Sequence, residues 1–345
     1  MINLVNFFPC LIAFGICIAC IVLLRPLAIR LGLVDIPQGR KQHQGQVPLI
    51  GGIAMFLGFL FSLLALPVSL LNYRSFIAGC ALLILVGILD DFHELSPRAR
   101  FIAQIVAALC MAAWGGVLLQ NLGNLFFYND FILHAWALPI TVVAVVGIIN
   151  AVNMTDGVDG LAGSVTLIEL LFLLFLALQG GQFFAAHMLM LVCSVVLAFL
   201  IFNFPFPGRI RAQVFMGDAG SMFLGFVLAW FLVELSQEPT KVSTPVTMLW
   251  IMALPLFDIG GVMVRRLQKR VSLFSPDREH LHHVLYDWGF TPVQITLILC
   301  GGALLCGLIG VITVRKNIPD GVMLISFIGL FMCYLGILSF SRKTV

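Results

Sequence analysis

The stretch at residues 292–314 reads PVQITLILCGGALLCGLIGVITV and carries no charged side chain. It is longer than the roughly 20 apolar residues that a helix needs to cross a bilayer. Runs of this kind recur along the chain between Gly, Pro, Asn and charged residues, and they predict an all-α polytopic integral membrane protein with about eleven transmembrane helices. The predicted spans are Leu4–Leu24, Leu49–Leu71, Ser75–Leu89, Phe101–Leu119, Leu133–Ile149, Leu161–Leu178, Phe183–Ile201, Phe215–Leu235, Val246–Val264, Pro292–Val314 and Val322–Phe340.

The composition agrees with a membrane protein. Of the 345 residues, 61% are hydrophobic and 10% are charged, whereas soluble globular domains are about 25% charged. These values exclude an ordinary soluble domain and a disordered chain. Because the spans use most of the sequence, we expect a single multi-span domain over residues 1–345. The nine cysteines lie in apolar runs without paired spacings, so we expect no disulfide or zinc framework.

The basic residues set the expected orientation, because cytoplasmic loops are enriched in Lys and Arg. With eleven spans, 15 of the 19 basic residues fall on one side of the membrane. The others are Arg74, Lys241, Arg315 and Lys316. We therefore expect the N-terminus outside and the C-terminus in the cytoplasm. The net charge is only +3 and the basic residues lie in short loops, so nucleic-acid binding has no support beyond those loops.

Most of the unusual polar residues fall in the loops that this topology places in the cytoplasm. These loops lie near residues 25–48, 90–100, 150–160, 203–218 and 265–291. A transporter is expected to carry polar groups near the midplane and to have related halves, whereas this sequence gathers its polar groups on one face. The pattern favours an enzyme with its active site at the cytoplasmic face.

The segment DDFHE, residues 90–94, predicts an acidic site at the inner end of the third span. Asp90, Asp91 and Glu94 would crowd together, and repulsion among carboxylates favours a bound cation. Oxygen ligands suit Mg2+, which typically takes one or two carboxylates together with substrate phosphates. The alternative is a solvated loop at a helix end.

Asn150, Asn153, Asp156 and Asp159 recur every third residue, with glycines nearby. This spacing keeps the side chains on one side of a turn-like or helical stretch. Amides and carboxylates together could recognise a nucleobase and ribose hydroxyls. A calcium loop, whose closing Glu is missing, and a plain polar re-entrant turn are the alternatives.

Asp218 lies in FMGDAGS, residues 215–221, at the start of the eighth span. Free N–H groups at a helix N-terminus attract anions, so Asp218 could hold a metal that bridges to a phosphate. The alternative is an Asp that caps the helix. The metal hypothesis depends on the other carboxylates lying close by.

The loop at 265–291 is basic and rich in histidine. The stripe RRLQKR, residues 265–270, could clamp a diphosphate or act as a topology signal alone. Ser275 and Pro276 then predict the start of a short interfacial helix that ends near Gly289. Three histidines there could bind phosphate or serve acid–base chemistry, with zinc binding as the alternative: His280, His282 and His283.

Glu169, His187, Glu234 and Asp258 are ionisable residues deep inside predicted spans. We expect Glu169, His187 and Glu234 to be paired structural groups. Asp258 lies about two turns from the basic loop, roughly 10 Å deep at 1.5 Å per residue, and could reach the site from beneath.

These polar stretches, in this order and on one membrane face, resemble the polyprenyl-phosphate N-acetylhexosamine-1-phosphate transferase superfamily over about residues 35–288. The segment SPDREHLHH, residues 275–283, is similar to the bacterial undecaprenyl-phosphate N-acetylglucosamine-1-phosphate transferases, with His-x-His-His. The phospho-N-acetylmuramoyl-pentapeptide transferases carry three consecutive histidines there. The long stretch between Asn203 and Phe215 favours the same branch. The first cytoplasmic loop is also similar to that of the family at Asp35, Pro37, Lys41, His43, Gly45, Pro48, Gly51 and Gly52.

The resemblance implies roles for particular residues. Those implied in catalysis are Asp90, Asp91, Asp156, Asp159 and His280. Those implied as ligands of Mg2+, with Mn2+ as a second candidate metal, are Asp90, Asp91 and Asp218. Those implied in substrate binding are Lys41, His43, Asn153, Asn203, Phe215, Arg265, His282 and His283, with Phe215 stacked on uracil. Glu94 departs from the Asp often found at its position.

The resemblance further implies transfer of N-acetylglucosamine-1-phosphate from UDP-N-acetylglucosamine to undecaprenyl phosphate, in the bacterial cytoplasmic (inner) membrane. The products would be undecaprenyl-diphospho-N-acetylglucosamine and UMP, and the lipid would start O-antigen lipopolysaccharide, common-antigen or teichoic-acid assembly. The alternatives are another UDP-N-acetylhexosamine, a nucleotide-sugar or lipid transporter, and a non-catalytic assembly subunit. A homodimer is left open. Direct attack by the lipid phosphate is favoured over a covalent sugar-phosphate intermediate.

Overall fold

The structure, a computed structural model, describes residues 7–35, 46–66, 69–206, 208, 209, 211–270 and 280–341, without the side chains of residues 340 and 341. Lys41 and His43 lie outside the described residues. The longer helices are α1 (Phe8–Leu31), α2 (Gly51–Ser62), α3 (Arg74–His93), α4 (Pro97–Leu109), α5 (Ala137–Thr155), α6 (Leu161–Gln179), α7 (Phe183–Asn203), α8 (Gly217–Glu234), α10 (Ala253–Gln268), α12 (Pro292–Arg315) and α13 (Asp320–Ser341). The shorter elements are β1 (Val34–Asp35), β2 (Val47–Pro48), η1 (Leu63–Ala65), η2 (Leu71–Tyr73), η3 (Cys110–Trp114), η4 (His134–Trp136), α9 (Pro245–Ile251) and α11 (Leu281–Asp287).

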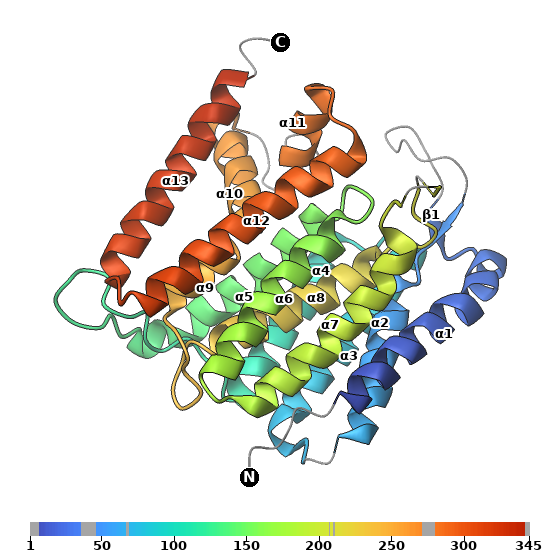
Figure 1. Cartoon of the computed structure of the whole chain (residues 1–345), viewed down its shortest axis with the longest axis horizontal. Helices are drawn as coiled ribbons and strands as arrows, with labels where there is room; N and C mark the ends of the chain where they lie inside the picture. Colours follow the sequence, from blue (N-terminus) through green and yellow to red (C-terminus); the bar gives the residue numbers. More distant parts are fainter. Residues whose placement is uncertain are drawn as a thin grey trace.

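The helices form one bundle, as an all-α polytopic membrane protein requires (Figure 1). Each of the predicted apolar runs contains a helix. Among the described residues, eight helices are long and apolar enough to cross a membrane, or nine if α9 and α10 form one broken span. The segment Gly51–Ala65 is apolar but shorter.

The predicted span Val246–Val264 is not a straight helix. It divides into α9 and α10, which meet at an angle of 82°. Pro255 lies in the first turn of α10 and has no N–H to donate to the carbonyl of Ile251, so the helical hydrogen bonds cannot run through this point. The break lies at Met252, between the two helices.

Helix α8 lies at the centre of the bundle. Its apolar window is 83% buried, compared with 17% for α1 and for α13. Small residues permit close approach, because a Cβ at Gly52 would meet the backbone of Gly220, and one at Gly87 would meet the backbone of Ala219. The N-terminus of α8 is therefore held tightly against α2 and α3.

The predicted intramembrane polar residues differ in their contacts. Glu234 is paired as expected, because Tyr73 Oη donates to its Oε1 at 2.6 Å and Trp230 Nε1 donates to its Oε2 at 2.9 Å. His187 Nδ1 lies 2.6 Å from a carbonyl of its own helix, that of Phe183. The prediction was wrong for Glu169, whose buried carboxylate oxygens have no hydrogen-bond partner among the described residues.

Replacing Glu169 with methionine is expected to raise the thermal unfolding temperature. A buried polar group without a partner costs about 1–3 kcal/mol, and methionine fills a similar volume without that cost. Unfolding of purified protein in detergent measures the effect, with Glu234→Met as the matched control. The control removes a partnered carboxylate and is expected to lower the unfolding temperature, and the same upward shift in both variants would contradict the explanation.

Candidate active site

A tight turn between α3 and α4 shapes the acidic end of the candidate site. Glu94 adopts a left-handed conformation, with φ 47°, and ends α3. Asp90 Oδ1 accepts the N–H of Leu95 at 2.7 Å, and Ser96 caps the next helix. The chain therefore reverses at once, and Arg100 Nη1 lies 3.1 Å from Asp90 Oδ2.

Asp91 caps the central helix α8. Its Oδ1 accepts the N–H of Asp218 at 2.8 Å, and its Oδ2 accepts the N–H of Ala219 at 3.3 Å. Gly217 has φ +71°, and a Cβ there would meet the Asp91 carboxylate, so this position requires glycine. The suggestion that Asp218 itself caps the helix is wrong, because no side chain of the helix serves as its N-cap.

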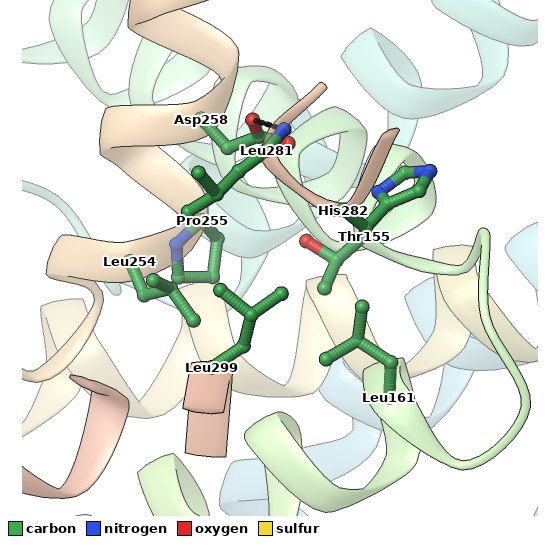
Figure 2. Close-up of a pocket in the computed structure, with 8 residues that line it drawn as sticks. All are labelled: Thr155, Leu161, Leu254, Pro255, Asp258, Leu281, His282 and Leu299. Carbon is green, nitrogen blue, oxygen red and sulfur yellow. Dashed lines mark hydrogen bonds between the residues drawn. The ribbon is translucent and has the colours of Figure 1, made fainter. Parts of the chain in front are cut away.

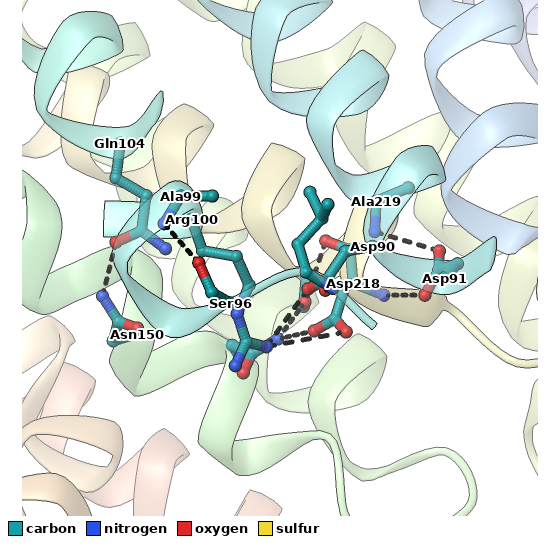
Figure 3. Close-up of polar contacts among 12 residues, drawn as sticks. Asp90, Asp91, Ser96, Ala99, Arg100, Gln104, Asn150, Asp218 and Ala219 are labelled. Carbon is teal, nitrogen blue, oxygen red and sulfur yellow. Dashed lines mark hydrogen bonds and ion pairs between the residues drawn. The ribbon is translucent and has the colours of Figure 1, made fainter. Parts of the chain in front are cut away.

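Asp218 joins two further elements to this end of the bundle (Figure 3). Its Oδ1 accepts a hydrogen bond of 2.5 Å from Asn153 Nδ2, which also donates to Ser221 Oγ at 2.8 Å. Its Oδ2 lies 3.9 Å from Arg100 Nη1. Two carboxylates, those of Asp90 and Asp218, therefore lie beside the Arg100 guanidinium, and a third, that of Asp91, is bonded to the backbone N–H of Asp218. Three carboxylates and one guanidinium leave a formal surplus of two negative charges.

The expected crowding of Glu94 with Asp90 and Asp91 is wrong, whereas Asp218 lies close to both, as the metal hypothesis for Asp218 requires. Glu94 is exposed, and in the described part of the chain it makes no hydrogen bond or ion pair with the carboxylates of Asp90 or Asp91. Its left-handed backbone at the end of α3 begins the turn that leads into α4. Asp218, distant in sequence, takes the place that was expected for Glu94.

Arg100 and Gln104 were missed by the sequence analysis. Gln104 is buried one helical turn beyond Arg100, and its Oε1 accepts Asn150 Nδ2 at 2.7 Å. Asn150 precedes Asn153 by one turn of α5, so this amide pair fixes α4 against the helix that carries Asn153. The signal was the spacing of an arginine and a glutamine on one helical face in an otherwise apolar run.

The loop after α5 is fastened to the segment before α8. Asp159 Oδ2 accepts the N–H of Ala212 at 2.8 Å. Asn203 is buried, and its Oδ1 accepts the N–H of Gly160 at 2.9 Å while its Nδ2 donates to the carbonyl of Val214 at 2.9 Å. Both ends of the Asn203 amide group are therefore bonded to the backbone, and the side chain holds the loop at Gly160 against the segment at Val214.

Asp156 directly follows α5 and lies near other carboxylates. Burial raises the pKa of Asp156 to about 7, and the negative charges of Asp218 and Asp159 act in the same direction. A carboxyl group in this state exchanges its proton near neutral pH. The hydrogen bond from Asn153 to Asp218 joins this stretch, residues 150–160, to the carboxylates of Asp90, Asp91 and Asp218.

Phe215 belongs to the segment that leads into α8. Its N–H donates to the carbonyl of Pro48 at 2.9 Å, and its carbonyl accepts the N–H of Gly51 at 3.0 Å. Pro48 pairs with Val34 in the antiparallel β1–β2 ribbon. These bonds fix the backbone of the half-buried Phe215 against the first cytoplasmic loop of the predicted topology, three residues before Asp218.

The histidine segment, residues 280–283, lies at the same end of the bundle. His282 is buried against Gly157, where an added Cβ would meet the imidazole ring. His280 Nδ1 lies 2.8 Å from Asp258 Oδ2, which places Asp258 beside the predicted histidine residues, as the sequence analysis expected. The predicted helix is present but short, since α11 comprises only Leu281–Asp287. Residues 271–279, which include its predicted start, lie outside the described residues.

A small pocket lies beneath His282, where the ends of several helices meet (Figure 2). It is lined by Thr155, Leu161, Leu254, Pro255, Asp258, Leu281, His282 and Leu299. Burial lowers the pKa of His282 to about 3, and the neighbouring His283 adds to this effect, so the ring is neutral at physiological pH. His283 is half-buried, and Arg265 is buried near the end of α10.

The acidic cluster fits a magnesium ion better than a zinc or calcium ion. In the part of the chain that the structure describes, no three His, Cys, Asp or Glu side chains are placed so that they could hold a metal ion by themselves. Zinc and calcium sites usually supply most ligands from the protein, whereas Mg2+ binds through one or two carboxylates, substrate phosphates and water. A surplus of negative charge at Asp90, Asp91 and Asp218 meets that requirement.

Comparison with known proteins gives consistent similarities. Residues 73–236 match the family model described as Glycosyl transferase family 4. The chain is 38% identical over 311 residues to undecaprenyl-phosphate alpha-N-acetylglucosaminyl 1-phosphate transferase of Yersinia pestis, covering 90% of this chain and 85% of that protein. The proteins of the same name are 36% identical in Escherichia coli (strain K12), covering 90% and 84%, and 37% identical in Haemophilus influenzae, covering 91% and 88%.

Proposed function

Since this chain belongs to glycosyl transferase family 4, in the branch of the undecaprenyl-phosphate N-acetylglucosaminyl 1-phosphate transferases, we propose that it transfers N-acetylglucosamine-1-phosphate from UDP-N-acetylglucosamine to undecaprenyl phosphate. A lipid phosphate oxygen forms a bond to the sugar-bearing phosphorus of the nucleotide sugar. The bond from that phosphorus to the bridging oxygen breaks, and its electron pair leaves with UMP. The other product is undecaprenyl-diphospho-N-acetylglucosamine.

The observation that carries this proposal is the meeting of three chemically different groups at one end of the bundle. The acidic cluster contacts Asn153, the loop that follows Asn153 contacts His282, and the histidine segment is bonded to Asp258. Phosphoryl transfer depends mainly on positioning and on neutralising charge, so groups that bind a nucleotide and two phosphates are sufficient. This layout supports a transferase.

Asp90, Asp91 and Asp218 would hold Mg2+, with Mn2+ as the second candidate. When bound, the ion would neutralise charge on the phosphates. Arg100 holds Asp90 and Asp218 together from the side of α4, and Asp91 fixes the backbone from which Asp218 projects. We favour direct attack, in which Asp90 accepts the proton of a protonated lipid phosphate. Labelled sugar-phosphate trapped on the protein without lipid would overturn direct attack.

The proposed topology has eleven passes, the N-terminus outside and the C-terminus in the cytoplasm of a bacterial inner membrane. Helix α1 begins and α13 ends at opposite ends of the bundle, which supports an odd number of passes (Figure 1). The acidic end of α3 and the histidine segment would then face the cytosol. This location suits a reaction between a soluble nucleotide and a lipid phosphate.

Release of UMP tests the proposal. Purified protein is expected to release UMP from UDP-N-acetylglucosamine only when undecaprenyl phosphate and Mg2+ are both present. Release with a different UDP-N-acetylhexosamine alone would keep the chemistry and change the sugar. Uptake of UDP-N-acetylglucosamine by sealed vesicles without UMP release would instead identify a transporter.

Replacing Arg100 with methionine is expected to lower UMP release about tenfold, because the carboxylates of Asp90 and Asp218 lose the cation between them. Arg98 is the matched control, since it lies on the same helix but is exposed. Arg98→Met is expected to keep its activity within about twofold. Equal losses in both variants would show that only the general charge of the loop matters.

A further inference from the structure

Asp258 uses both carboxylate oxygens to hold the start of α11. Its Oδ2 is bonded to His280 Nδ1 at 2.8 Å, and its Oδ1 accepts the N–H of Leu281 at 2.7 Å. Tyr334 of α13 also donates to Oδ1, at 3.4 Å. Figure 2 shows Asp258 and Leu281 joined at the edge of the pocket. One carboxylate from the broken span therefore fixes both the residue that precedes α11 and its first residue.

This contact determines which ring nitrogen of His280 carries hydrogen. An ionised carboxylate can only accept hydrogen bonds, so the bond requires hydrogen on Nδ1. In the neutral ring, Nε2 then keeps its lone pair, and in the protonated ring it becomes a donor. The bond thus fixes the ring orientation and leaves Nε2 for another partner.

The His280 ring that Asp258 holds is connected through His282 to the loop that follows α5. The rings of His280 and His282 are nearly parallel, with an interplanar angle of 6° and centroids 5.7 Å apart. His282 in turn packs against Gly157, beside Asp156. A shift of Asp258 would therefore move the histidine segment relative to the loop that precedes α6.

We propose that Asp258 is a positioning residue for the transfer reaction, which holds His280 with hydrogen on Nδ1 and presents its Nε2 to the diphosphate of the nucleotide sugar. This inference rests on the proposed function. In this role Asp258 acts through His280 and contacts no substrate itself. Asp258 affects the turnover rate only by fixing the orientation and the hydrogen bonding of the His280 imidazole.

A double-mutant cycle tests the coupling. Asp258→Asn and His280→Gln are each expected to reduce kcat for UMP release roughly 10²-fold, with KM for UDP-N-acetylglucosamine changed far less. The double variant is expected to be no slower than His280→Gln alone, because Asp258 acts only through that ring. Losses that multiply in the double variant would overturn the proposal, as would wild-type kcat in Asp258→Asn. Asp287→Asn, an exposed change on α11, is expected to keep wild-type activity.

Nitrogen NMR of histidine in the wild-type protein provides a measurement that needs no stable Asp258 variant. With ¹⁵N-labelled histidine, and with His280→Gln to assign the signal, the Nδ1 resonance of His280 is expected to be that of a nitrogen bearing hydrogen. A bare Nδ1 would overturn the proposal. Because this measurement needs no turnover, failure of UMP release together with a hydrogen-bearing Nδ1 would contradict the proposed function while leaving the anchoring contact intact.

Discussion

Asp218→Asn is expected to reduce UMP release roughly 10³-fold while the protein remains folded. The side chain of Asp218 is 31% exposed and projects from the second residue of α8, where Asp91 fixes its backbone N–H. Asparagine keeps the shape but removes one of the two carboxylate charges that are paired with Arg100. Loss of charge stabilisation at a transferring phosphate is typically worth 10²–10³-fold or more. The Mg2+ concentration for half-maximal release is also expected to rise.

The measurement compares Mg2+ titrations of UMP release for wild type and Asp218→Asn, with unfolding temperatures recorded on the same samples. Asp287→Asn serves as the control, because it removes one carboxylate from an exposed position on α11. Activity of Asp218→Asn within about threefold of wild type at every Mg2+ concentration would exclude Asp218 as a metal ligand.

Asp91→Asn is a less informative variant, although the sequence alone makes it the obvious choice. Both oxygens of Asp91 accept N–H groups at the start of α8. An amide would turn a donor toward one of these N–H groups, so activity and helix capping would fail together. The structure therefore makes Asp218→Asn a more informative variant than Asp91→Asn.

The sequence was sufficient to predict the helices, because burial in lipid requires long apolar runs whatever their neighbours are. It did not predict the break at Met252, since hydropathy continues through Pro255 and only the missing N–H marks the bend. The prediction that polar residues gather at one end of the bundle likewise did not depend on how the helices pack. Asp90, Asn153 and Asp218 lie on three different helices, and their contacts agree with that prediction.

The individual partners were less predictable, because they depend on which helices meet. Glu94 is close in sequence to Asp90 but leaves the cluster at a left-handed turn, whereas Asp218 enters it from α8. Glu169 and Glu234 look alike in sequence, yet among the residues that the structure describes only Glu234 meets hydrogen-bond donors, from α8 itself and from η2. Sequence spacing describes neighbours on one helix and carries no information about donors on another.

Gly157→Ala is expected to reduce kcat/KM for UMP release roughly 10²-fold with little change in unfolding temperature. The added Cβ would meet the ring of His282, which is 4% exposed. Displacement of about 1 Å in a catalytic arrangement can cost this much. Since Gly157 itself is exposed, the loop can shift without unfolding the bundle.

Two further variants separate this clash from a general effect of alanine. Gly147→Ala, where a Cβ meets nothing within 4 Å, is expected to retain full activity. In a His282→Ala background, Gly157→Ala is expected to cause no further loss, because the ring that it would strike is gone. A second large loss in that background would mean that Gly157 acts on the reaction by a route other than His282. Full activity of Gly157→Ala with His282 intact would show that the close contact between Gly157 and His282 is not needed for turnover. The histidine segment and the loop that follows Asn153 would then have to act on the substrate independently.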